Sequence, residues 1–122
     1  MLLNSIANRQ HDDPVVITGD FNSTEHSTVI RYLKGIMIPG EFDSCPCPMV
    51  DSYRMLHPRK LAGTYNLFMG YRFGPKIDFI FIEPRTKVLD SEIRYDRINR
   101  RYPSDHFPVT ASLQLQYPLR TE

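Results

Sequence analysis

The feature that most constrains the fold is an apolar segment at residues 76–82, KIDFIFI, which contains a single acid, Asp78. A short run rich in Ile and Phe is typical of a buried β-strand. A carboxylate inside such a strand is costly unless another polar group pairs with it. The segment therefore predicts a sheet core and, elsewhere in the chain, a partner for Asp78.

A second strand is predicted near the end of the chain. Residues 109–116, VTASLQLQ, alternate strictly between apolar and polar side chains, which is the pattern of a strand with one buried face. Asp105 and His106 come just before it, in a loop between two prolines. Loops at the ends of rigid strands often carry chemistry, so this pair is a candidate site. Asp105 could equally form only a turn.

A third strand is predicted at residues 15–18, VVIT, which we expect to be buried on both faces. It ends at residues 19–22, GDFN, where the glycine permits a tight turn. Ser23 or Thr24 could cap a following helix over about residues 27–34. The apolar side of that helix would consist of Val29, Ile30 and Leu33. A strand, a glycine turn and a helix in succession indicate an α/β arrangement.

The other segments give weaker signals. The apolar residues within 2–6 have helical spacing, and residues 86–95 and 63–68 are strand candidates. Residues 50–56 are ambiguous between helix and strand, with Asp51 as a cap or turn former.

A basic stretch lies just before the loop that contains Asp105. It consists of Arg94, Arg97, Arg100 and Arg101. A solvated charged face is the ordinary interpretation of such a stretch. A patch that faces a phosphate is the sharper alternative, because the stretch leads directly into the candidate site.

Composition narrows the classes of function. The 122 residues fit one domain, and 41% hydrophobic residues are typical of a globular chain. A net charge of +1 argues against a strongly cationic nucleic-acid module. No apolar run approaches the roughly 20 residues that span a bilayer. Cys45 and Cys47 are too close for an ordinary disulfide, and we expect free thiols.

Three predicted strand ends carry polar groups that could converge at one edge of a sheet. They are Asp20 with Asn22, Asp78, and Asp105 with His106. Carboxylates with an imidazole and an amide, and no nucleophilic Ser or Cys motif, suit metal-assisted hydrolysis. Oxygen ligands favour Mg²⁺ or Mn²⁺.

Three motifs, in order, resemble those of the endonuclease/exonuclease/phosphatase (deoxyribonuclease I-like) superfamily. They are residues 19–22 (GDFN), 76–81 (KIDFIF) and 104–109 (SDHFPV). The resemblance extends over about residues 14–115. It implies an α/β (α+β) fold, a four-layer α/β sandwich with mainly antiparallel β-sheets and flanking helices.

The resemblance also implies a role for each matching residue. Asp20 resembles the carboxylate that orients or deprotonates the attacking water, and Asn22 the amide that holds the nucleophile and a phosphate oxygen. Asp105 resembles a metal-associated carboxylate, and His106 the imidazole at the scissile phosphate. Asp78 resembles the carboxylate that fixes the ring of His106, which would be the partner that the apolar strand requires. The implied enzyme is a Mg²⁺- or Mn²⁺-dependent phosphodiesterase or phosphatase that uses in-line attack of an activated water.

Substrate-binding candidates lie just before the Asp78 strand. Asn66 and Arg72 are near aromatic residues, and cations with aromatics suit phosphate contact and stacking. They equally suit a turn packed on the sheet. The class of phosphoester stays open, and nucleic acid is less favoured than a small phosphoester or a lipid headgroup because the net charge is balanced.

Members of this family are longer than the present chain. The resemblance implies that their N-terminal half supplies an Asn, a metal-binding Glu and a His that have no counterpart here. We therefore expect residues 1–122 to form a single partial domain, equivalent to the C-terminal half. One sheet of a sandwich would expose its inner face, so a missing N-terminal half or self-association is expected. The alternative to a hydrolase is a catalytically inert fragment or pseudoenzyme that keeps the motifs as scaffold. In a third interpretation, the three aspartates are only caps and turn residues.

Overall fold

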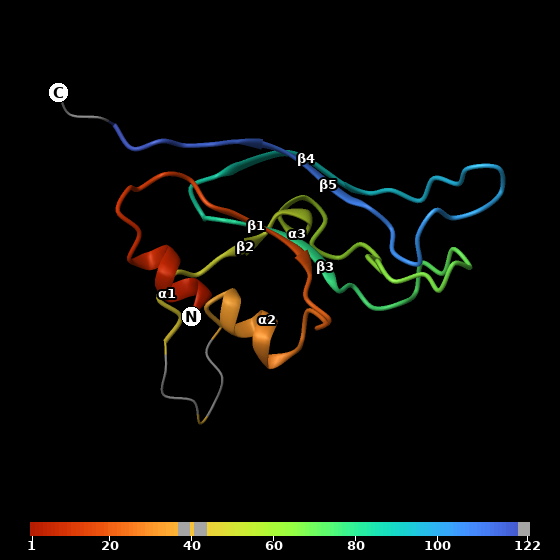
Figure 1. Ribbon diagram of the computed structural model, residues 1–122, viewed down its shortest axis with the longest axis horizontal. Helices are drawn as coiled ribbons and strands as arrows, with labels where there is room; N and C mark the ends of the chain where they lie inside the picture. The colour runs from red at the N-terminus through yellow and green to blue at the C-terminus, as the bar shows by residue number, and fades with distance from the viewer. Residues whose placement is uncertain (37–39, 41–43, 120–122) are drawn as a thin grey trace.

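A three-stranded sheet and a two-stranded sheet form the framework of the computed structural model, which describes residues 1–36, 40 and 44–119 (Figure 1). The first sheet has the order β1-β3-β2, with β1 (Val16–Asp20), β2 (Val50–Asp51) and β3 (Asp78–Ile82). The second pairs β4 (Lys87–Ile93) with β5 (Val109–Gln114). All of these pairings are antiparallel. The structure thus confirms a mixed α/β class with antiparallel sheets, while the four-layer sandwich stays a prediction.

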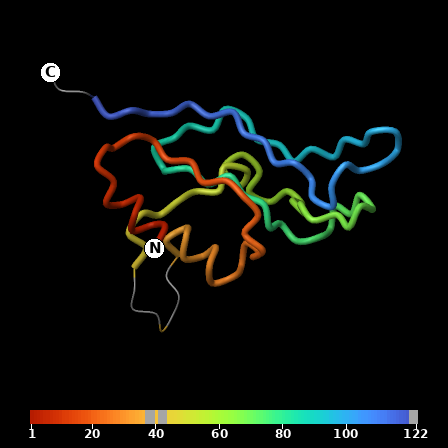
Figure 2. The backbone as a smooth tube through the Cα atoms, in the orientation of Figure 1, coloured from red at the N-terminus to blue at the C-terminus, as the bar shows by residue number. Residues whose placement is uncertain are grey.

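Two short helices cover one face of the first sheet. They are α1 (Leu2–Ala7) and α2 (Thr28–Leu33), which lie below the sheet in Figures 1 and 2. Phe79 and Phe81 project from β3 into this layer, because residues two apart in a strand share a face. The remaining buried members of this cluster are Leu3, Ile6, Ile30, Leu33 and Met49.

The start of α2 differs from the prediction. Ser27, rather than Ser23 or Thr24, is the N-cap, and its hydroxyl accepts a hydrogen bond from the N–H of Ile30 at 3.4 Å. Val29 does not belong to the buried side of the helix, since its side chain is exposed. The capping residue therefore lies closer to the first helical turn than the sequence suggested.

A third helix, α3 (Ser52–Leu56), packs against both β3 and β4 and so joins the two sheets. Asp51 caps it by accepting a hydrogen bond from the N–H of Tyr53 at 3.0 Å, as predicted. The ambiguous segment 50–56 is thus a two-residue strand followed by a helix. A second apolar cluster lies beside α3 and consists of Tyr53, Ala62, Ile93 and Phe107.

A buried ion pair fixes the start of β3. Lys76 Nζ lies 3.0 Å from Asp51 Oδ2, 3.0 Å from the carbonyl oxygen of Asp78, and 3.6 Å from the ring centroid of Phe79. Burial lowers the pKa of Lys76, and the charge of Asp51 opposes this effect.

Two predictions about strands are wrong. β1 is not buried on both faces: it lies at the edge of its sheet in the described residues, and four of its five residues are exposed. Residues 63–68 do not form a strand, because the only β-type contact there is an isolated bridge between Tyr65 and His106. In contrast, β4 and β5 match their predicted segments, and β5 alternates between half-buried and exposed residues.

Two further expectations concern membrane spans and thiols. Cys45 and Cys47 are free and half-buried. Within the described part of the chain, no helix has the length and apolar character needed to cross a bilayer.

Candidate active site

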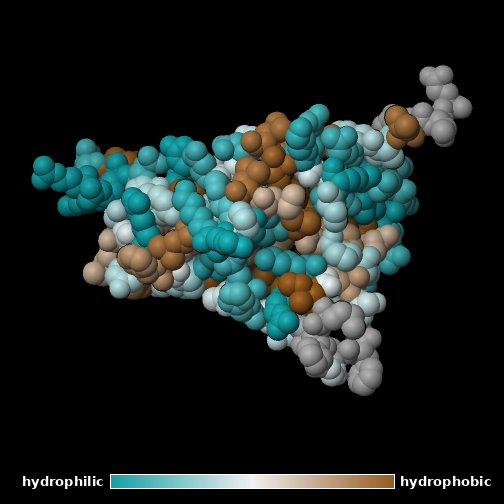
Figure 3. All heavy atoms as spheres, turned by 180° about the vertical axis from the view of Figure 1, so that it is seen from behind, coloured by the Kyte–Doolittle hydropathy of each residue, from teal (hydrophilic) through white to brown (hydrophobic). Residues whose placement is uncertain are grey.

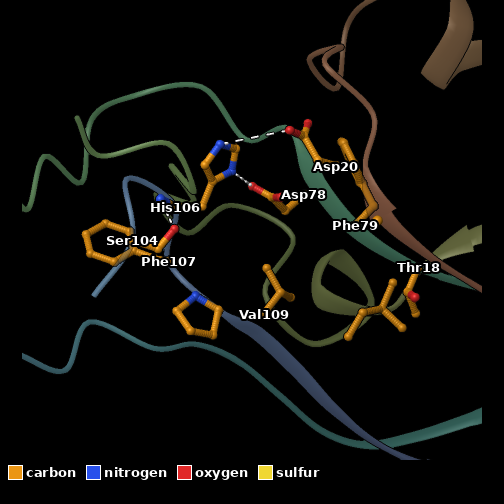
Figure 4. Close-up of a pocket in the computed structure, with 11 residues that line it drawn as sticks. Thr18, Asp20, Asp78, Phe79, Ser104, His106, Phe107 and Val109 are labelled. Carbon is orange, nitrogen blue, oxygen red and sulfur yellow. Dashed lines mark hydrogen bonds and ion pairs between the residues drawn. The ribbon is translucent and has the colours of Figure 1, made fainter. Parts of the chain in front are cut away.

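A cleft of about 500 Å³ opens beside the end of β1 (Figure 4). Its lining comes from β1, β3, β5 and the loop before β5: Thr18, Gly19, Asp20, Asp78, Phe79, Ile80, Ser104, His106, Phe107, Pro108 and Val109. Asp20, Asp78 and His106 are the titratable groups among these residues. The structure therefore brings together three of the residues that the motifs predicted.

Asp20 and Asp78 come from neighbouring strands. Asp20 is the last residue of β1 and Asp78 the first of β3, and the antiparallel register places them as direct partners. Like charges directly opposite each other in a sheet are destabilising. A positive or hydrogen-bonding group is therefore required between or beside them.

His106 supplies that group from the loop between β4 and β5 (Figure 4). Its Nδ1 lies 2.7 Å from Asp78 Oδ2, and its Nε2 lies 3.9 Å from Asp20 Oδ2. On the same side, Asp105 Oδ1 is 4.0 Å from Nε2. The hydrogen bond to Asp78 is the main cause that raises the pKa of His106 above its usual value, with further contributions from the charges of Asp78, Asp20 and Asp105 against desolvation. Asp78 thus has the partner that its apolar strand requires.

Thr64, a buried residue before β3, links the backbone segments that carry Asp78 and His106. The Thr64 hydroxyl accepts hydrogen bonds from the N–H groups of Ile77 and Asp78 at 3.0 and 3.2 Å. The Thr64 carbonyl accepts a hydrogen bond from the N–H of Phe107 at 2.7 Å. One buried threonine therefore bonds to the backbone on both sides of the Asp78–His106 contact.

Asn66 extends this support to the loop itself. Its N–H donates to the carbonyl of Asp105 at 2.7 Å, and its side-chain amide donates to the carbonyl of Ser104 at 3.4 Å. The Ser104 hydroxyl in turn accepts a hydrogen bond from the N–H of His106 at 3.0 Å. In Figure 2, the green segment around residues 64–66 meets the blue segment around residues 104–107. Thr64 was not predicted to be a positioning residue, although its place before an acid-bearing strand was a usable signal.

The other predicted residues have different surroundings. Asn22 has a left-handed backbone (φ 48°), and its N–H donates to Asp20 Oδ1 at 2.8 Å. Asn66 is completely buried, and Arg72 lies over the ring of Tyr95 at 4.1 Å from the centroid. Roles in nucleophile or substrate binding for Asn22, Asn66 and Arg72 stay predictions.

The donor set suits a hard divalent cation. Asp20, Asp78 and His106 each offer one ligand atom, and these atoms lie within 4.8 Å of one another. Asp105 is outside this group, but its carboxylate faces the same imidazole nitrogen. One oxygen of Asp78 already bonds to His106, so the more exposed carboxylates of Asp20 and Asp105 have oxygens to spare. Oxygen donors of this kind fit Mg²⁺ or Mn²⁺.

Comparison with known proteins identifies a family and several similar folds. The model of the endonuclease/exonuclease/phosphatase family matches residues 2–106. No curated protein gives a significant match. Among solved structures, a conserved protein of unknown function from Enterococcus faecalis V583 shares the fold, with a TM-score of 0.71, 22% identity, and coverage of 94% of this chain and 42% of that one.

Two structures from Bacteroides thetaiotaomicron are also similar. A mannosyl-6-phosphatase has a TM-score of 0.64 and 27% identity over 91% of this chain and 41% of its own. An endonuclease/exonuclease/phosphatase family protein has a TM-score of 0.63 and 27% identity over 90% of this chain and 40% of its own. The present chain thus spans about two-fifths of the length of these three structures.

Proposed function

The chain belongs to the endonuclease/exonuclease/phosphatase family, and on that premise we propose that it carries part of a site for metal-dependent hydrolysis of phosphoesters. The observation that carries the proposal is the 2.7 Å contact between His106 Nδ1 and Asp78 Oδ2 beside Asp20. An imidazole that is fixed through one nitrogen and faces a cleft with the other is suited to proton transfer or to charge stabilisation.

His106 would act on the phosphoryl group. With Nδ1–H donating to Asp78, Nε2 is directed toward the acidic side of the cleft. The raised pKa of His106 increases its cationic fraction near neutral pH, and the cation would donate a hydrogen bond to a phosphoryl oxygen. Negative charge that builds up during in-line attack would be stabilised in this way.

Asp20 would orient the attacking water and take its proton. Its Oδ2 faces Nε2 of His106 at 3.9 Å, so a water bound to Asp20 would lie next to the phosphoryl group that His106 contacts. Asp20 and Asp105 are the residues that would hold Mg²⁺ or Mn²⁺. The bound ion would supply Lewis-acid stabilisation of phosphoryl charge.

One similar structure indicates which class of substrate to test first. Because a mannosyl-6-phosphatase is 27% identical to this chain, we propose a phosphomonoester as the first substrate to test. A catalytically inert scaffold is the second candidate, and it is favoured by the position of Asp105, the predicted metal-associated carboxylate, outside the group of possible ligand atoms. We further propose that the chain is equivalent to the C-terminal half of the family domain.

The two candidates are separated by an assay of the 122-residue chain with 4-nitrophenyl phosphate and bis(4-nitrophenyl) phosphate. Mg²⁺ or Mn²⁺ is added and then removed with a chelator. If the chain is a hydrolase, the wild type should hydrolyse one of these compounds with the metal ion present. His106→Gln and Asp20→Asn should each reduce this activity by about 10²-fold or more. Asp90→Asn, an exposed acid on β4, is the matched control and should retain full activity. A chain that folds by circular dichroism and hydrolyses neither compound would support the inert scaffold.

A further inference from the structure

Two loops form one end of the molecule beyond the cleft, at the right in Figure 1. We call residues 67–73 and 94–101 the loop tip. The guanidinium of Arg72 lies 4.1 Å from the ring centroid of Tyr95, which joins the first loop to the second. Gly70 packs so closely against Tyr102, just past the second loop, that a Cβ atom there would overlap its phenol. The loop tip is therefore one surface rather than two independent loops.

Large apolar side chains project from this surface. In the first loop they are Leu67 (53% exposed), Phe68 (61%), Met69 (74%), Tyr71 (54%) and Phe73 (76%), and in the second Ile98 (65%). None of them belongs to either apolar core cluster. Figure 3 shows this end at the left, where hydrophobic atoms lie beneath a hydrophilic projection. Such a concentration of exposed apolar groups is typical of an interaction surface.

The backbone of the loop tip is strained at two of these apolar residues. Leu67 and Phe68 both have φ of 59°, in the left-handed region that bulky residues avoid. Asn99 and Arg100 also lie in this region, and two 2.9 Å backbone hydrogen bonds between Ile98 and Arg101 close their turn. A glycine or asparagine would form the first turn at less cost and expose less apolar surface. Folding alone therefore does not account for Leu67 and Phe68.

Positive charge surrounds the apolar groups. Arg72, Arg97, Arg100 and Arg101 are exposed, and no carboxylate within the described ranges forms an ion pair with them. Arg94 differs, because it pairs with Glu92 and Asp96. Four arginines on one end of a chain with a net charge of only +1 are a local excess.

We propose that the loop tip docks on an anionic phospholipid surface. Exposed apolar side chains would enter the boundary between headgroups and acyl chains, and the arginines would contact anionic headgroups. Leu67, Met69 and Ile98 favour lipid over nucleic acid, because bases stack on aromatic rings and not on aliphatic chains. Two of the aromatic rings, Tyr71 and Phe73, already contact each other edge to face at 6.0 Å.

The loop tip is continuous with the cleft. Tyr65 and Asn66 precede it and bond to the backbone around Asp105 and His106. A recess of about 120 Å³, lined partly by Ile98, Tyr102 and His106, lies between the second loop and the imidazole. Docking would therefore bring the cleft close to lipid headgroups. The proposal concerns binding alone and does not depend on hydrolysis.

A single tryptophan can report this docking, since the chain contains none. Phe73→Trp places it on the loop tip, and Leu89→Trp places it on the exposed side of β4 as a matched control. Vesicles of phosphatidylcholine with phosphatidylserine should shift the emission of the Phe73→Trp chain to the blue, and brominated lipids should quench it. The Leu89→Trp chain should show neither change. Equal responses from both, or none from Phe73→Trp, would overturn the proposal.

The charge requirement is tested by vesicle sedimentation. Each arginine near an anionic membrane contributes about 1 kcal/mol of attraction, which corresponds to roughly fivefold in affinity. Arg100→Gln with Arg101→Gln should therefore weaken vesicle binding about 25-fold. The matched pair Arg59→Gln with Lys60→Gln, exposed elsewhere, should change it little. Equal losses from both pairs would contradict a specific docking surface. A single-stranded oligonucleotide is the competing ligand. If the chain binds it more tightly than vesicles, and the variant with Arg100→Gln and Arg101→Gln loses this binding, the loop tip is a nucleic-acid surface instead.

Discussion

Asp20 and Asp78 are direct partners across the β1–β3 pair, and His106 bonds to one of them and faces the other. Two carboxylates at such a position repel each other, so the imidazolium form of His106 compensates the charge of the sheet edge. The protonation state of one side chain is therefore coupled both to the fold and to the candidate chemistry.

Asp78→Asn should lower the pKa of His106. The hydrogen bond from Asp78 is the first cause of the upward shift, and an amide holds a cationic ring less strongly than a carboxylate does. NMR titration of the His106 ring would measure the change. Asp105→Asn is the control, because Asp105 contributes least of the three carboxylates that raise the pKa of His106. An unchanged pKa in Asp78→Asn would contradict the assigned contact.

The stability that His106 contributes should fall as pH rises. Its pKa is raised in the folded state, so this contribution is complete below the unfolded value of about 6.5 and is lost as pH passes through the folded value. Urea unfolding of the wild type and His106→Gln at acidic, neutral and mildly alkaline pH would show it. The difference between the two chains should be largest at acidic pH. A difference in unfolding free energy that grows with pH would contradict a raised pKa of His106 in the folded state.

Thr64→Val should destabilise the protein by about 1–3 kcal/mol, because the buried N–H groups of Ile77 and Asp78 lose their acceptor. Valine keeps the shape of the side chain, so the loss reports the hydroxyl rather than a cavity. The same change at Thr110, which is exposed on β5, is the control and should have little effect. Denaturant unfolding measures both, and equal effects would remove the special role of Thr64.

Lys76→Met should cost about 3–5 kcal/mol, because it leaves the charge of Asp51 buried without a partner. Adding Asp51→Asn should recover much of this loss, since an amide is neutral and still caps α3 through its oxygen. The free energies of unfolding of the two single variants and the double variant form a cycle. Additive losses would show that the two side chains do not interact.

The chain should self-associate as its concentration rises. β1 is an edge strand among the described residues and most of it is exposed, and such edges invite pairing with another chain. Size-exclusion chromatography over a concentration series would detect this association. Val16→Lys, a charge on the exposed edge strand, should shift the chain toward monomer. A wild-type chain that stays monomeric and unfolds sharply at high temperature would contradict the expectation.

Much of the site was predictable because its residues lie where local patterns change. Asp78 stands out within an apolar strand, and a strand that holds a carboxylate needs a partner, which proved to be His106. The alternation in β5 and the cap by Asp51 are likewise local signals, and the structure confirms both.

Other features depend on the fold as a whole and leave little trace in the sequence. The apolar composition of β1 predicted burial, but exposure depends on which neighbours cover a strand. Substrate binding by Asn66 stays a prediction, and its hydrogen bonds to the backbone of the Asp105 loop depend on a fold that brings residues 66 and 105 together. The pairing of the two loops at the tip follows from contacts such as Gly70 with Tyr102, which no periodicity indicates.

The place of β1 at the edge of its sheet has a consequence for motion. A strand with one paired neighbour can detach in a local opening that leaves the rest of the molecule folded. Such an opening carries Asp20 away from the imidazole but leaves the Asp78–His106 contact intact, because Thr64 bonds to the backbone on both of its sides. Amide hydrogens of β1 should thus exchange with deuterium earlier than those of β3, and the proposed water-activating carboxylate would be the first part of the centre to dissociate.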